Sequence, residues 1–139
     1  FVVSPHHKQI DLIKEEVSNL EPDWEPFVDT VDKMQGQEAD VVLISYGLSS
    51  FADAMKESSF IYSRNRMNVS ITRAKKKCIL FLSQALFDVP ATNQFDPELG
   101  PHYKYFIDLK EILEQDANKS AEEMNGHPTI IYRLSKVTM

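Results

Sequence analysis

The chain alternates short apolar runs with longer segments in which apolar residues recur at helical spacing. Four of the short runs have the length of buried strands: 1–4, 27–31, 41–46 and 78–83. Apolar residues return every three or four positions at 7–20, 64–75 and 103–116, which predicts helices there. Strands that alternate with helices favour an α/β fold built on a parallel sheet. The run 41–46 is apolar on both faces, so we expect it to be central in that sheet.

The remaining segments have weaker patterns. We expect a loop at 47–62 with a short helix near 51–56, and irregular structure at 84–101, which holds three prolines. Residues 117–127 are polar and predict a loop or a frayed helix, followed by a late strand at 129–134. The length of 139 residues is typical of a single domain.

Composition places the chain among ordinary globular domains, since 42% of its residues are hydrophobic and 26% are charged. The one cysteine, Cys78, lies in an apolar run, so we expect a buried thiol, no disulfide and a reducing, intracellular compartment. No apolar stretch is long enough to span a membrane. Because the sequence begins with Phe1 and not with Met, we expect it to be a fragment of a longer protein.

Charge is unevenly distributed along the chain. The net charge is −6, but residues 58–87 contain six basic residues and no acidic ones. The remainder therefore holds 9 of the 15 basic residues and all 21 acidic residues, a net charge of −12. A basic patch on an acidic body indicates a surface that faces phosphate groups.

Two arginines share one face of the predicted helix 64–75. Spacings of four and three residues place Arg66, Ser70 and Arg73 on that face. A neighbouring face is apolar and is expected to point into the core: Met67, Ile71 and Ala74. Guanidinium groups on a rigid helix are suited to binding phosphate with fixed geometry. A solvated basic helix face explains the spacing equally well.

The loop after the second strand is another candidate binding segment, because ligands of parallel α/β sheets bind in loops at the carboxyl ends of strands. Gly36 would permit a backbone conformation or a close approach that a side chain blocks. Glu38 could accept hydrogen bonds from a ribose hydroxyl, and Thr30 could donate one to a phosphate oxygen. An ordinary polar crossover loop is the alternative, because glycine, glutamine and aspartate are common in loops.

Segments of this sequence resemble motifs of superfamily 1 helicases. Residues 30–38 read TVDKMQGQE and, with the strand that follows them, resemble motif V. Residues 68–75 read NVSITRAK and resemble motif VI. Residues 2–6 and Gln9 resemble the motif IV region of the branch that contains the nonsense-mediated-decay helicase and the replication helicase/nuclease. The resemblance covers residues 1–85 and leaves the rest of the chain without a motif.

The resemblance implies a fold and roles for individual residues. Helicases of this superfamily have two RecA-like lobes that bind ATP in the cleft between them, and the match is to the second lobe. By this resemblance, Arg73 is the arginine finger that reaches the γ-phosphate. Gly36 and Glu38 belong to the nucleotide site, with Glu38 on the ribose. The chain is then a single RecA-like lobe, residues 1–139, with 86–139 as an extension.

The resemblance also implies contacts with a nucleic-acid strand. Thr30 and Val31 would touch single-stranded DNA or RNA, and Gln35 would couple that contact to the nucleotide. Arg66 would support the motif VI helix, although an ion pair with a carboxylate of the same lobe is an equally good interpretation.

ATP and Mg²⁺ are the ligands that the resemblance implies for the complete protein. None of the four glycines is followed by Lys-Ser or Lys-Thr, so this sequence has no phosphate-cradling loop. We therefore expect a missing first lobe to bind most of the nucleotide and the metal, and this chain alone to be inactive. His6 and His7 have no third ligand at suitable spacing, so no metal site is expected here.

Two other functions stay open on the sequence alone. The chain could be a non-catalytic nucleic-acid or protein-binding module that keeps the lobe's fold, or an unrelated doubly wound nucleotide-binding domain. A phosphate-binding loop and an acidic Mg²⁺ site upstream of Phe1 in a longer chain would distinguish the motor lobe from both.

Overall fold

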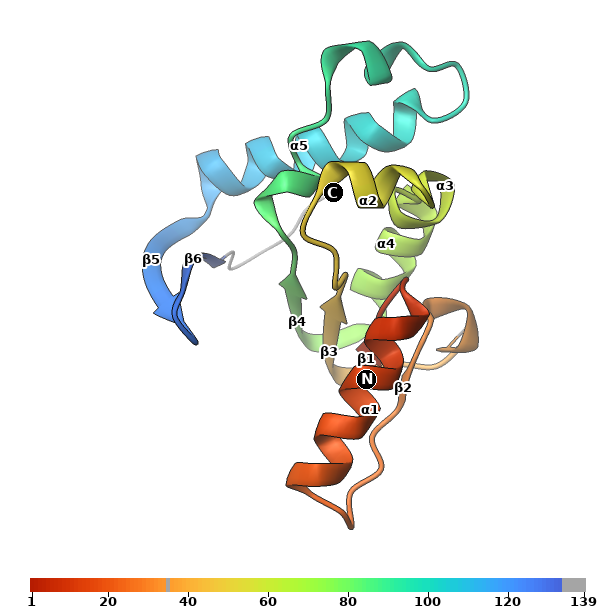
Figure 1. Ribbon diagram of the computed structural model, residues 1–139, viewed down its shortest axis with the longest axis vertical. Coiled ribbons are helices and arrows are strands. Elements are labelled where there is room, and N and C mark those ends of the chain that lie inside the picture. The colour runs from red at the N-terminus through yellow and green to blue at the C-terminus, as the bar shows by residue number, and fades with distance from the viewer. Residues whose placement is uncertain (35, 134–139) are drawn as a thin grey trace.

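The computed structural model describes residues 1–34 and 36–133, and a four-stranded sheet lies at its centre (Figure 1). The strands lie in the order β2-β1-β3-β4: β1 Val2–Val3, β2 Val28–Asp29, β3 Ala39–Ser45 and β4 Ala74–Phe81. Every pair is parallel, and Val2 pairs with both Val28 and Leu43. The predicted α/β fold with a parallel sheet is confirmed, and the strand expected to be central is β3, an inner strand.

Helices connect these strands and cover the sheet. The described residues form five α-helices and three short 3₁₀ helices: α1 His7–Leu20, α2 Phe51–Met55, α3 Ser58–Ile61, α4 Arg64–Thr72, α5 Gly100–Asp116, η1 Val31–Met34, η2 Gln84–Leu86 and η3 Ala91–Phe95. The predictions of α1, of the short α2 and of α5 are confirmed. Helix α1 contacts β2, whereas α4 contacts β3, β4 and α5. No helix in this part of the chain is long and apolar enough to cross a membrane.

The core lies between the sheet and the helices α4 and α5. Val42 of β3, Met67 of α4 and Phe106 of α5 are each at most 1% exposed. The Tyr62 ring meets Phe106 edge-on at 5.0 Å between centroids, and its hydroxyl donates to the Leu86 carbonyl at 2.7 Å. A buried tyrosine with a satisfied hydroxyl packs without an energetic penalty for its polar end. Helix α5 therefore shares one core with the motif-bearing part of the chain.

Several element boundaries differ from the sequence prediction, and two of them lie beside residues named in the motifs. The second strand ends at Asp29, and Val31 begins η1 instead of extending the strand. The helix that we expected to reach residue 75 ends at Thr72, and β4 begins at Ala74. Pairing with β3 satisfies the backbone groups at the start of β4, so the sheet prevails there over a longer helix.

A two-stranded antiparallel sheet follows α5: β5 Asn118–Met124 and β6 His127–Arg133. Asn125 and Gly126 connect the strands with φ angles of 51° and 79°, both in the left-handed region, as a type I′ turn requires. The loop or frayed helix expected at 117–127 is therefore wrong, because most of that segment is β5. The late strand expected at 129–134 is confirmed for residues 129–133, and Leu134 lies outside the described residues. Figure 1 shows this hairpin in blue, beyond the end of α5.

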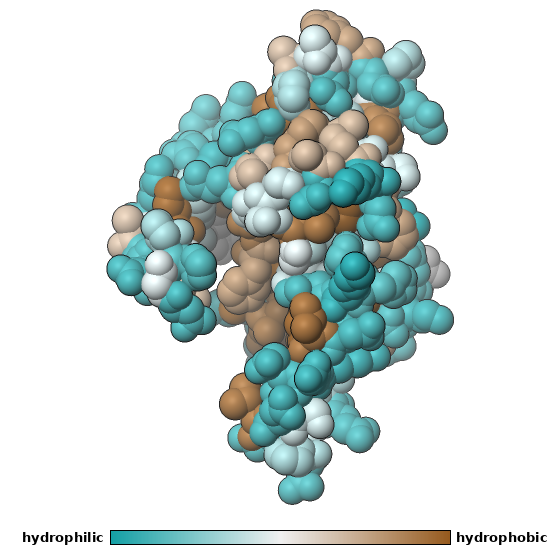
Figure 2. All heavy atoms as spheres, in the orientation of Figure 1, coloured by the Kyte–Doolittle hydropathy of each residue, from teal (hydrophilic) through white to brown (hydrophobic). Residues whose placement is uncertain are grey.

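One face of the central sheet is incompletely covered. Val41 of β3 and Phe81 of β4 are apolar, yet they are 41% and 49% exposed. Figure 2 shows apolar side chains over the middle of the molecule, where β3 and β4 lie in Figure 1, with hydrophilic residues around them. Cys78 is half-buried against the core and not fully buried as the sequence predicted, and this burial raises the pKa of its thiol to about 11.

Candidate nucleotide and nucleic-acid site

The predicted site residues lie at two opposite edges of the sheet. All four strands are parallel, so a residue that follows a strand lies at the carboxyl edge and one that precedes a strand lies at the amino edge. Thr30 and Val31 directly follow β2, whereas Glu38 and Arg73 directly precede β3 and β4. The expectation that the whole loop lies at the carboxyl ends is therefore wrong for Glu38, because the crossover carries it to the amino edge.

At the amino edge, a backbone hydrogen bond joins the two segments that resemble motifs V and VI. The Arg73 carbonyl accepts a hydrogen bond from the Ala39 N–H at 3.0 Å, and Ala39 pairs with Ala74. Glu38 and Arg73 therefore precede two paired residues on neighbouring strands. Arg73 is also the C-cap residue of α4, and its N–H donates to the Val69 carbonyl at 3.2 Å. These contacts fix the backbone on which the Arg73 side chain is mounted.

The Arg73 guanidinium has an unused donor. The side chain is half-buried, and its Nε is buried without a hydrogen-bond partner. Among the residues that the structure describes, no Asp or Glu forms an ion pair with Arg73. Buried polar groups nearly always have a hydrogen-bond partner, so the unpaired guanidinium nitrogen makes Arg73 a candidate ligand-binding residue. A phosphate oxygen is an acceptor of the right chemistry.

Gly36 is required by its backbone conformation. Its φ angle is +76°, in the left-handed region that only glycine adopts readily. A Cβ atom at this position would meet no atom within 4 Å, so no close approach within the lobe demands a glycine. Of the two explanations that the sequence left open, the conformational one holds within this lobe. Glu38, two residues further on, is exposed and its carboxylate is free to meet a ligand hydroxyl.

At the carboxyl edge, an open depression of about 280 Å³ separates η1 from the start of α4. Six residues line it: Val31, Asp32, Ser63, Asn65, Arg66 and Val69. Thr30 lies beside it, only 6% exposed, and its N–H donates to the Asp29 Oδ1 at 2.8 Å. Gln35, the third residue predicted to contact nucleic acid, lies outside the described residues.

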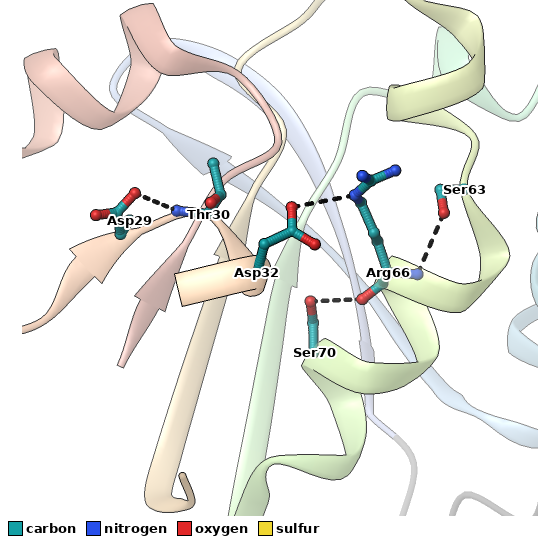
Figure 3. Close-up of polar contacts among 6 residues, drawn as sticks. All are labelled: Asp29, Thr30, Asp32, Ser63, Arg66 and Ser70. Atoms are coloured by element: carbon teal, nitrogen blue, oxygen red, sulfur yellow. Dashed lines mark hydrogen bonds and ion pairs between the residues drawn. The ribbon is translucent and has the colours of Figure 1, made fainter. Parts of the chain in front are cut away.

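Arg66 forms an ion pair with a carboxylate of the same lobe, which is one of the two roles that the sequence left open for it. Its Nε lies 3.3 Å from the Asp32 Oδ2, and its guanidinium lies 4.0 Å from the centre of the Phe60 ring (Figure 3). Ser70 is buried, and its hydroxyl donates to the Arg66 carbonyl at 2.7 Å. Arg66 and Arg73 lie near opposite ends of α4, so Arg66 is at the carboxyl edge of the sheet and Arg73 at the amino edge.

The lysines that follow Arg73 are exposed on β4, which is an edge strand. Lys76 forms a 3.5 Å ion pair with Asp40, and both side chains are mostly exposed. Lysines at a sheet edge discourage pairing with other chains, so their position does not require a phosphate ligand.

The arrangement is suited to part of a nucleoside triphosphate. Arg73 offers a donor for phosphate, and Glu38 offers an exposed acceptor for a hydroxyl. Within the described residues, no group of three or more His, Cys, Asp or Glu could hold a metal ion.

The fold and the order of the two motifs define the second RecA-like lobe of a superfamily 1 helicase. The chain belongs to the AAA domain family AAA_12, which matches it over residues 1–85.

Several helicases resemble the chain over the same region. JHS1 of Arabidopsis thaliana, a DNA replication ATP-dependent helicase/nuclease, is 34% identical over 83 residues, which are 60% of this chain and 6% of that protein. DNA2 of Homo sapiens, with the same description, is 33% identical over 100 residues, 69% of this chain and 8% of that protein. The probable RNA helicase armi of Drosophila melanogaster is 30% identical over 84 residues, 58% of this chain and 7% of that protein. The chain thus spans only a small part of the length of these relatives.

Proposed function

We propose that this chain is the second motor lobe of an ATP-dependent nucleic-acid helicase or translocase. Membership of the helicase-lobe family supports the proposal, as do relatives described as ATP-dependent helicases. One observation carries the proposal. The buried Arg73 Nε has no acceptor, and Arg73 directly precedes β4, which pairs with the strand that begins directly after Glu38. A phosphate oxygen held by a first lobe would supply that acceptor.

Arg73 would act as an arginine finger. Transfer of the γ-phosphoryl group to water spreads negative charge over the phosphate oxygens, and a guanidinium from the second lobe stabilises this charge. In comparable enzymes an arginine of this kind accelerates hydrolysis by about 10³- to 10⁵-fold. Because the guanidinium would reach the γ-phosphate only when the two lobes close, hydrolysis and movement along the strand become one cycle.

The remaining residues of the site would bind the two ligands. Glu38 accepts a hydrogen bond from the ribose, with the turn at Gly36 presenting it at the amino edge. Thr30 and Val31 contact the backbone of single-stranded DNA or RNA at the carboxyl edge, and Gln35 couples that contact to the nucleotide. Mg²⁺, bound with most of the ATP by the first lobe, would neutralise phosphate charge.

We further propose that residues 1–139 are one lobe of a longer chain. Tyr103 and Phe106 of α5 are at most 1% exposed in the core that the motif-bearing part forms, which supports including α5 in the lobe. A first lobe with the phosphate-binding loop is the partner that this organisation requires.

The decisive experiment is Arg73→Ala in a chain that holds both lobes. We expect strand-stimulated ATP hydrolysis to fall by about 10³-fold or more, while nucleotide binding is largely kept. Lys75→Ala removes a positive charge from an exposed side chain two residues away and is the matched control. Hydrolysis that survives Arg73→Ala would refute the assignment. If the two-lobed chain binds strands but never hydrolyses ATP, the chain is a non-catalytic binding module.

A further inference from the structure

Within the described residues, a single ion pair joins η1, at the carboxyl edge, to α4, the helix that directly precedes Arg73. Asp32 lies on η1, two residues after Thr30, and its Oδ2 meets the Arg66 Nε at 3.3 Å. Arg66 lies near the beginning of α4, and Arg73 follows the helix's last residue. Figure 3 shows the two side chains spanning the space between η1 and α4. Among the described residues, no other hydrogen bond or ion pair joins η1 to α4.

The Arg66 side chain is held from both sides. The Phe60 ring lies 4.0 Å from its guanidinium carbon, so the cation is stacked as well as paired. Its backbone N–H donates to the Ser63 Oγ at 3.3 Å, and its carbonyl accepts from Ser70 at 2.7 Å. These contacts restrain both the guanidinium and the backbone of Arg66, which leaves its side chain little freedom to change rotamer.

The ion pair is too exposed to matter much for stability. The Arg66 side chain is 37% exposed and the Asp32 side chain 48% exposed, and pairs in such surroundings contribute little to folding. Helix α4 is instead anchored by Met67, which is 1% exposed in the core. The pair can therefore be removed without unfolding the lobe, which leaves its geometry to be explained by another role.

We propose that Asp32 and Arg66 are positioning residues that transmit strand binding at η1 to the Arg73 finger. The inference rests on the proposed function, in which Thr30 contacts the strand and Arg73 contacts the γ-phosphate. Helix α4 has nine residues and moves as a rigid element, so a displacement at its first turn shifts Arg73 at its other end. The amount by which a strand stimulates hydrolysis then depends on this ion pair.

A double-mutant cycle tests the inference in the two-lobed chain. The variants are Asp32→Asn, Arg66→Gln and the combination of both, each assayed for ATP hydrolysis with and without a single-stranded oligonucleotide. We expect each single variant to lower the stimulated-to-basal ratio by about 2- to 30-fold. The combination should be no worse than the worse single variant, because each change breaks the same contact. Basal hydrolysis and the KM for ATP should be unchanged, which a merely destabilised lobe would not show.

Asp108→Asn is the matched control, because it neutralises an equally exposed aspartate that pairs with Lys104 at 2.7 Å on α5. Arg66→Lys, which keeps the charge, replaces Arg66→Gln if the latter fails to fold, and it should lose less of the stimulation. Full stimulation in both single variants, or losses that add in the combination, would overturn the inference. If Arg73→Ala also leaves hydrolysis intact, the proposed function itself has failed. If Arg73→Ala abolishes hydrolysis while the pair variants are silent, only the coupling has failed.

Discussion

Glu38 and Arg73 are distant in sequence but precede strands that pair, and the Arg73 carbonyl bonds to the residue after Glu38. Their side chains therefore start from neighbouring points of one sheet edge. The sequence motifs named both residues but could not place them, because the edge depends on where each strand begins. For Glu38, the crossover after β2 had to be traced to its end before the amino edge could be assigned.

The ribose contact proposed for Glu38 predicts a change in affinity with little change in turnover. Glu38→Ala removes a charge-assisted hydrogen bond, so we expect the KM for ATP to rise by roughly tenfold or more, with kcat nearly constant. Steady-state kinetics of the two-lobed chain measure both quantities. Glu25→Ala, in the exposed turn between α1 and β2, is the control. A KM equal to that of the parent protein would remove Glu38 from the nucleotide site.

Gly47 is constrained by conformation and by space at once. Its φ angle is +67°, and a Cβ there would lie 2.7 Å from the Gln9 side chain, which donates to the Ser45 Oγ at 2.9 Å. We expect Gly47→Ala to lower the free energy of unfolding by about 1–3 kcal/mol, because strain and displacement of Gln9 add. Gly126→Ala is the control, since its φ of +79° has no steric neighbour within 4 Å. Equal losses in denaturant titrations would exclude the contact with Gln9.

At the scale of elements, the parallel sheet and its main helices could be predicted from hydrophobic periodicity, but the junction of α4 and β4 could not. Lys75 to Lys77 are good helix formers, so the periodic pattern runs on past the true end of the helix. Their strand conformation is set by pairing with β3, a contact between segments far apart in sequence. An ion pair of Arg66 could be anticipated, but its partner Asp32 could not, because the pair needs η1 and α4 to be side by side.

The β5–β6 hairpin was missed although the sequence contains its marker. Strand β5 is polar and mostly exposed, so it has no hydrophobic alternation to reveal it. Asn125-Gly126 is, however, a dipeptide typical of the two-residue turn that the structure contains. A search for turn dipeptides such as Asn-Gly, made before the search for hydrophobic periodicity, would have predicted this hairpin.

A polar cluster centred on the Glu114 carboxylate connects this hairpin to α5. Glu114 on α5 accepts a hydrogen bond from the Tyr132 hydroxyl and lies 3.0 Å from Lys110 and 3.2 Å from Lys119. The Tyr132 hydrogen bond and then the two lysines lower the pKa of Glu114 to about 2, below its ordinary value of 4.5. A depressed acidic pKa means that the contact is complete above pH 4.5 and is lost as the pH falls towards 2.

We therefore expect the amides of β5 and β6 to lose exchange protection before those of β3 when the pH falls through this window. Hydrogen exchange at several pH values, corrected for intrinsic rates, measures the difference. In Glu114→Gln the same loss should already be present at neutral pH, because the neutral amide cannot pair with both lysines. Protection of β5 and β6 that follows β3 at every pH would contradict the role of Glu114.

At the scale of the whole molecule, two segments cross the sheet in the same direction. Residues 30–38 run from the carboxyl edge to the amino edge, and α4 with Arg73 makes the same journey on the way to β4. One edge thus presents the proposed strand contacts and the other the proposed nucleotide contacts. A lobe built in this way can connect its two ligands without a long chain of residues between them.

The same architecture supplies only half of a nucleotide site. In the proposed function Arg73 would stabilise charge on a γ-phosphate, but this sequence lacks the lysine-bearing loop that cradles the β- and γ-phosphates. We therefore expect the 139-residue chain to show no steady ATP turnover, with or without a single strand, in a phosphate-release assay. The two-lobed chain is the positive control, and its Arg73→Ala variant sets the background. Turnover by the isolated lobe that Arg73→Ala removes would mean that the lobe binds the triphosphate by itself, and the division of labour between two lobes would have to be abandoned.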